Sequence, residues 1–123
     1  MASQPEHSPS EPTPAGSEAI AAAVFAALAD PTRRSILGEL AARGPATATD
    51  LSGRLPISRQ AIAKHLGLLT AAGLVRTEAG ERRRVRFRLQ SGPMSVAQAF
   101  LAAMARDWDE SLGRLRDHLD GIR

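Results

Sequence analysis

The hydrophobic pattern of this chain is helical along most of its length, and it changes to a strand-like alternation in one short segment, residues 74–89. Apolar residues spaced three or four apart predict helices over residues 17–29, 31–43, 47–55 and 58–72, and a long helix over 94–120. The expected fold is therefore mainly α with a small β-hairpin, in the order of four helices, two strands and one long helix.

Capping residues mark where the predicted helices begin and end. Ser17, Asp30 and Ser58 each precede an apolar-periodic segment, and their side chains suit the N-cap position. Gly44 and Gly73 follow the last periodic residue of the second and fourth helices, where glycine commonly stops a helix. The third helix is shorter and starts at Thr47 or Thr49.

Two runs, residues 74–78 and 85–89, form the predicted hairpin. Alternation places Val85, Phe87 and Leu89 on its inner face, with Arg84, Arg86 and Arg88 on the opposite face. Five arginines therefore gather on one hairpin: Arg82, Arg83, Arg84, Arg86 and Arg88. Such a cluster suits phosphate neutralisation or insertion into a minor groove, although charge on an edge strand also prevents sheet aggregation.

Two short helices joined by a tight turn, followed by a basic hairpin, are typical of a winged helix-turn-helix. The helix that begins after Ser58 then has the dimensions to lie in the major groove, held to the core by Ile62, Leu66 and Leu69. The candidate DNA-contacting residues of this helix are Ser58, Arg59, Gln60, Lys64 and His65. Double-stranded DNA is the expected partner.

The long last helix carries the clearest apolar stripe, running from Val96 to Ile122. The stripe is longer than a core of this size can cover, so it predicts a homodimer interface. The interface residues would be Phe100, Met104, Trp108, Leu112, Leu115 and Leu119. Alternatively, the stripe closes the core of its own subunit over the first helix, and both arrangements can hold in part.

The charge distribution agrees with a polyanionic partner. The formal net charge is +3, but residues 18–90 carry twelve Lys and Arg against six Asp and Glu. Residues 1–16 are rich in Pro, Ser and Glu and are expected to be a disordered tail, which leaves residues 17–123 as one DNA-binding and dimerisation domain. There is no signal-peptide pattern and no apolar run long enough to span a membrane, so we expect a cytoplasmic protein without a membrane partner.

Catalysis is not expected. The chain has no cysteine, which excludes disulfides, thiol nucleophiles and thiolate-zinc sites, and it has neither a clustered His, Asp and Glu set nor a Gly-rich phosphate loop. We therefore predict no catalytic residue and no cofactor. A winged-helix module that binds proteins and not DNA is the alternative function.

Three motifs resemble the ArsR family of bacterial regulators: FAALADPTRRSIL at Phe25–Leu37, ISRQAIAKHL at Ile57–Leu66, and AGLV at Ala72–Val75. The resemblance spans residues 20–120. It implies a dimeric repressor that binds a palindromic operator near its own promoter and leaves when an effector binds.

The resemblance also indicates where metal would bind in metal-sensing members. Thr47 and Thr49 stand where those members have Cys-x-Cys, and the last helix has Asp107, Asp109 and His118 in place of the ligand pattern and spacing of the family's second site. We therefore predict no metal site. The effector, if there is one, is not identified by the sequence.

Overall fold

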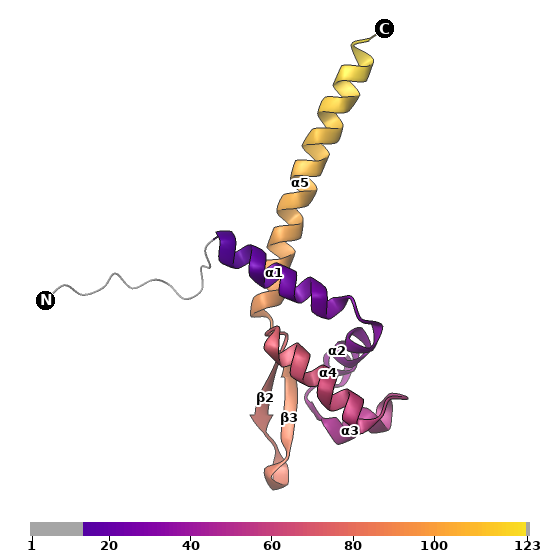
Figure 1. Ribbon diagram of the computed structural model, residues 1–123, viewed down its shortest axis with the longest axis vertical. Helices are drawn as coiled ribbons and strands as arrows, with labels where there is room; N and C mark the ends of the chain where they lie inside the picture. Colours follow the sequence, from indigo (N-terminus) through magenta and orange to yellow (C-terminus); the bar gives the residue numbers. More distant parts are fainter. Residues whose placement is uncertain (1–13, 123) are drawn as a thin grey trace, which may run out of the picture.

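The structure, a computed structural model, describes residues 14–122 and has the predicted order of helices and strands (Figure 1). The fold class is confirmed: the chain is mainly helical, with a small antiparallel sheet. The elements are α1 Pro14–Leu28, α2 Pro31–Arg43, β1 Ala46–Thr47, α3 Ala48–Arg54, α4 Arg59–Ala71, β2 Val75–Ala79, a 3₁₀ turn Glu81–Arg83, β3 Val85–Leu89 and α5 Gly92–Asp120.

Helix α1 begins at Pro14, so the prediction that Ser17 is its N-cap is wrong. Residues 14–16 are helical and do not belong to a tail. The apolar stripe on which the prediction relied starts at Ile20, later than the helix itself. The remainder of the predicted tail, residues 1–13, lies outside the described residues.

Side-chain caps fix the starts of the next helices. The Asp30 carboxylate accepts a hydrogen bond from the backbone N–H of Arg33 at 2.9 Å, and this bond lowers the pKa of Asp30. At α3, Thr47 and Asp50 form a reciprocal capping box with both bonds at 3.0 Å. The bond that the Thr47 backbone N–H donates to the Asp50 carboxylate is the main cause that lowers the pKa of Asp50, and the Thr47 side chain is the second.

The core lies where α1, α2, α3 and α4 meet the first turns of α5. Ile36, Leu51, Ile62, Leu66 and Leu69 are its largest fully buried side chains on the helices. This apolar burial stabilises the fold and holds α4 by one face only.

The sheet has three strands in the order β1-β3-β2, all antiparallel, and β1 was not predicted. In the registers of the sheet Ala46 lies opposite Phe87, and Val75 lies opposite Leu89. Phe87 packs against the core, but Val85 and Leu89 are 52% and 41% exposed, so the predicted inner face is wrong for these two residues. The hairpin extends beyond the helical body (Figure 1).

Gly73 joins α4 to the hairpin. Its φ is +76°, and the N–H groups of Gly73 and Leu74 donate to the carbonyls of Thr70 and Leu69, which is the Schellman pattern. A Cβ at this position would lie 2.7 Å from Pro93 Cγ, at the start of α5. Glycine is therefore required here both by the backbone conformation and by the close approach of α5.

Helix α5 has two parts. Its first turns pack against α1, where the rings of Phe25 and Phe100 are 6.2 Å apart, and the rest projects away from the body on the side opposite the hairpin (Figure 1). Phe100, predicted to lie in a dimer interface, therefore packs within its own chain. The apolar side chains beyond it are exposed: Leu101, Met104, Trp108, Leu112, Leu115, Leu119 and Ile122. No helix within residues 14–122 has both the length and the apolar character needed to cross a bilayer.

Candidate nucleic-acid interface

Helix α4 presents a polar face at its first turns because its buried side chains, Ile62, Leu66 and Leu69, lie on the other side. Ser58 caps the helix, with its hydroxyl oxygen accepting a hydrogen bond from the Ala61 N–H at 3.2 Å. Arg59, Gln60 and Lys64 are exposed on the first turns, where the sequence predicts base-reading residues. Arg and Gln suit bidentate hydrogen bonding to guanine and adenine edges, respectively.

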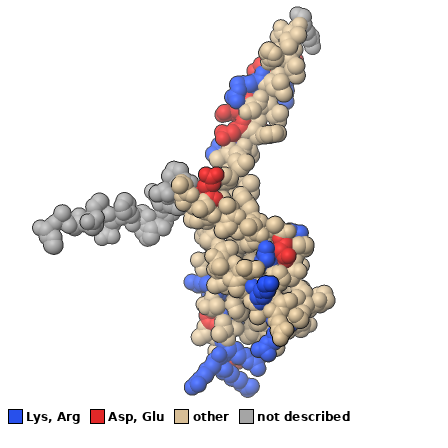
Figure 2. Space-filling view, in the orientation of Figure 1, with Lys and Arg blue, Asp and Glu red and all other residues tan. Residues whose placement is uncertain are grey.

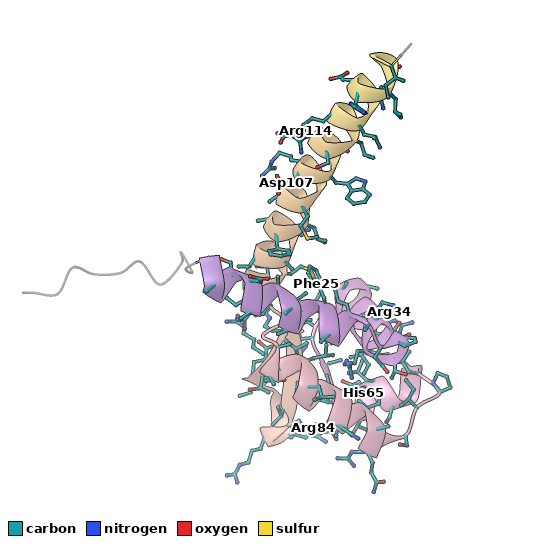
Figure 3. All side chains as sticks on the ribbon, turned by 45° about the horizontal axis from the view of Figure 1, so that its top comes forward. Phe25, Arg34, His65, Arg84, Asp107 and Arg114 are labelled. Atoms are coloured by element: carbon teal, nitrogen blue, oxygen red, sulfur yellow. The ribbon has the colours of Figure 1, made fainter. Side chains whose placement is uncertain are left out.

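His65 has a different position from the one predicted. Its Nδ1 lies 3.5 Å from Arg33 Nη1 and 3.9 Å from the Asp30 carboxylate, and its side chain is 20% exposed. Figure 3 shows His65 among the helices of the body. We therefore leave His65 out of the candidate DNA surface.

Arg33 explains how α4 is held against the other helices, and sequence analysis missed it. Its guanidinium donates to the carbonyls of Ala27 at 2.8 Å and Ala26 at 3.1 Å, at the end of α1, while also facing His65 of α4. One side chain thus links three helices. Nothing in the sequence distinguishes Arg33 from its neighbour Arg34.

The tip of the hairpin, or wing, presents three arginines to solvent. Arg82 and Arg83 have left-handed backbones with φ of 56° and 60°, and Arg84 follows in an extended conformation. Within residues 14–122 the three side chains make no hydrogen bond or ion pair. Figure 2 shows blue side chains gathered at this end of the molecule.

The other two predicted wing arginines contact the protein itself. Arg86 donates to the Pro45 carbonyl at 3.2 Å, and Arg88 lies 3.4 Å from the Glu78 carboxylate. Both are half-buried. Arg82, Arg83 and Arg84 are therefore the wing arginines most available to a partner.

A cavity of about 610 Å³, which we call the basic hollow, lies between the start of α4 and the wing. It brings Arg59 of α4 together with Arg84 of the wing. Its other lining residues are Thr47, Ala48, Thr49, Val85 and Phe87, and none is acidic. Two guanidinium groups beside threonine hydroxyls form a surface suited to phosphate, and the sequence did not reveal that they converge.

Thr47 and Thr49, where the sequence resemblance indicated that metal would bind in other members, have other contacts here. Thr47 caps α3 and Thr49 lines the basic hollow. Within the described part of the chain, no three His, Asp or Glu side chains gather as metal ligands.

Comparison with known proteins agrees with this geometry. A helix-turn-helix domain family matches residues 28–78. The chain is 48% identical over 69 residues to the HTH-type transcriptional regulator YuzN of Bacillus subtilis, covering 51% of this chain and 75% of that protein. It is 40% identical over 86 residues to the HTH-type transcriptional regulator Rv2034 of Mycobacterium tuberculosis, covering 70% and 76%.

A solved structure extends the similarity to nearly the whole described fold. The ArsR-like transcriptional regulator from Rhodococcus sp. RHA1 superposes with a TM-score of 0.74 at 41% identity, covering 83% of this chain and 94% of the other.

Proposed function

Because this chain belongs to the ArsR family of winged helix-turn-helix transcriptional regulators, we propose that it represses transcription as a homodimer bound to a palindromic operator. Members of this family regulate transcription and are not enzymes. The observation that carries the proposal is the basic hollow, where Arg59 of the recognition helix and Arg84 of the wing converge next to the exposed face of α4.

The proposed division of labour on DNA follows from the side chains. Arg59 and Gln60 read base edges in the major groove, and Lys64 contacts the backbone beside them. Ser58 caps the helix and so fixes where α4 begins. We propose that the free backbone N–H groups at this helix start bind a DNA phosphate. The wing arginines Arg82 to Arg84 neutralise phosphates or enter the adjacent minor groove.

Dimerisation is proposed through α5. The helix has 29 residues, or about 43 Å at 1.5 Å per residue, and only its first turns are covered by α1. Trp108 is 67% exposed and Leu115 is 53% exposed, which is unusual for side chains of this size unless a partner covers them. We propose that α1 to α5 act as one DNA-binding and dimerisation domain, with a two-fold axis near this stripe.

Repression follows from occupancy. A dimer places two α4 helices about 34 Å apart, one turn of DNA, so that it binds two symmetric half-sites. A protein bound across a promoter in this way excludes polymerase, and we propose that this takes place in the bacterial cytoplasm.

The test is selection of duplexes from a random-sequence library by the purified full chain, followed by fluorescence anisotropy on the enriched and scrambled duplexes. We expect an enriched palindrome, bound by a dimer. Arg59→Ala or Gln60→Ala should cost about 1–3 kcal/mol on the palindrome, with a much smaller effect on scrambled DNA. Arg43→Ala, an exposed position on α2 outside the basic hollow, is the matched control.

Failure to prefer any duplex at low ionic strength would contradict the proposal and favour the protein-interaction module. A reporter gene placed behind the selected palindrome then separates repression from activation: the proposal requires lower expression when the protein is present.

A further inference from the structure

A second cavity, which we call the apolar cavity, lies away from the basic hollow and has a volume of about 510 Å³. It is formed by the end of α1, by α2 and by the junction between β3 and α5. The apolar side chains of its wall are Leu28, Leu37, Ala41, Leu74, Leu89 and Met94. Its size and lining are those of small-molecule sites, which are mainly apolar with a few polar groups.

Arg34 supplies the one charge in the wall of this cavity. Its Nη1 donates to the Leu28 carbonyl at 2.6 Å, and within residues 14–122 it has no ion-pair partner. The only other side chains in the wall with hydrogen-bonding groups are Gln90 and Ser91. No carboxylate of the protein therefore competes for this guanidinium inside the cavity.

Leu89 connects the cavity to an unexplained feature of the fold. Hairpin alternation places it on the inner face, yet it is 41% exposed, and it lies in the wall of the apolar cavity. An apolar molecule in the cavity would cover the Leu89 side chain and remove it from water, which is favourable. In the protein alone this side chain stays partly exposed.

We propose that the apolar cavity binds a small amphipathic anion, an apolar molecule with one carboxylate or sulfonate group held by Arg34, and that this ligand is the effector of the regulator. The effector role rests on the proposed function. The charge and the apolar lining together select this class, since a neutral molecule leaves Arg34 unpaired and a polyanion has no second cation to meet.

The position of the cavity explains how a ligand would reach the DNA surface. Leu74 precedes the first wing strand and Leu89 ends the second, whereas Leu28 belongs to α1 and Met94 to α5, the helix that carries the proposed dimer stripe. A ligand that contacts all four biases the wing relative to α1 and α5. Because coupling between two binding sites is reciprocal, operator DNA should also change the affinity for the ligand.

The direct test uses the fluorescent sulfonate 8-anilinonaphthalene-1-sulfonate, displaced by octanoate or by its neutral match 1-octanol. Saturable binding is expected, with octanoate displacing the probe and octanol much weaker. Arg34→Gln should lower the affinity for the probe by about 10-fold or more, which is the contribution of one charge-assisted hydrogen bond. Arg43→Gln, which removes an exposed arginine of the same helix outside the cavity, should not change binding.

Gly38→Leu blocks the cavity without damaging the fold. No atom lies within 4 Å of the Cβ that Gly38 lacks, and leucine favours a helix more than glycine does. Gly38 lines the cavity, so the added side chain should abolish probe binding, whereas Ala42→Leu on an exposed position outside it should not. Full probe binding by a folded Gly38→Leu variant would overturn the proposed site. Conversion of the protein from a dimer to a monomer by Gly38→Leu would also overturn it, because the cavity would then be filled by a second copy of the chain and not by a small molecule.

The regulatory half is tested by operator anisotropy with octanoate, using equal concentrations of acetate as the ionic control. Operator affinity should fall about 5-fold or more for the wild-type protein, the lower end of measured couplings. It should not respond in Gly38→Leu, which keeps the basic hollow intact. Probe binding without any change in operator affinity overturns the effector role. Absence of binding to any duplex refutes the proposed function instead, and the probe titration still decides the site.

Discussion

The three arginines at the wing tip offer a quantitative test of DNA binding. The side chains of Arg82, Arg83 and Arg84 make no hydrogen bond or ion pair within residues 14–122, so their replacement should change folding stability by less than about 0.5 kcal/mol. Glutamine is the suitable replacement because it retains length and polarity without adding a β-branch at the left-handed residues Arg82 and Arg83.

The expected loss follows from counterion release. Each phosphate neutralised contributes about 0.9 to the slope of log K against log salt, so three contacts contribute about 2.7 for each wing engaged. The electrostatic contribution of the three contacts vanishes at about 1 M salt. At about 0.1 M salt, a slope of about 2.7 raises the affinity for DNA by roughly 500-fold over its value at 1 M. The triple glutamine variant should therefore lose affinity equally on operator and scrambled duplexes, and its salt slope should flatten by this amount.

The measurement is fluorescence anisotropy over a series of salt concentrations. The control variant replaces Arg106, Arg114 and Arg116 of α5 with glutamine, because it removes the same charge from a region distant from the wing. Either variant lowers the formal net charge from +3 to zero. If the control flattens the slope as much as the wing variant does, the effect comes from net charge and the assignment of phosphate contacts to the wing is refuted.

Three further outcomes are expected. Gly73→Ala should destabilise the fold by at least about 1–2 kcal/mol in urea denaturation, because φ is +76° and the new Cβ meets Pro93; unchanged stability would contradict this geometry. Trp108→Asp should convert a dimer to a monomer in sedimentation experiments while preserving the helical circular dichroism signal, and a persistent dimer would exclude the α5 interface. Stability should be full above about pH 4 and fall as pH drops through the lowered pKa values of Asp30 and Asp50, measured by urea midpoints; Asp50→Asn should flatten this dependence.

The sequence predicts those parts of the fold that depend on local chemistry. The spacing of Ile62, Leu66 and Leu69 and the cap at Ser58 are sufficient to define α4, since both are encoded within one helix. Strand β1 was missed because two residues carry no periodicity, and its partner β3 is distant in sequence. The exposure of Val85 depends on how far the hairpin extends beyond the body, which alternation does not report, and that of Leu89 depends on a cavity between distant helices.

The candidate site divides in the same way. The exposed positions of Arg59, Gln60 and Lys64 follow from helical geometry, once the buried face is known. The environment of His65 does not, because Asp30 and Arg33 reach it from another helix. The convergence of Arg59 and Arg84 is likewise a tertiary property. The DNA-binding roles of these residues remain predictions.

At the wing tip, the backbone conformation that favours folding stability and the side chains proposed to bind DNA require different residues. A left-handed conformation costs a non-glycine residue roughly 1–2 kcal/mol, so glycine at either position would relieve strain in the turn while deleting a cation from the edge that we propose faces DNA. Thermostability screens of this protein should therefore enrich glycine at Arg82 and Arg83, and screens for tight operator binding should reject it. A variant library sorted by both criteria would show the two properties trading off at these positions.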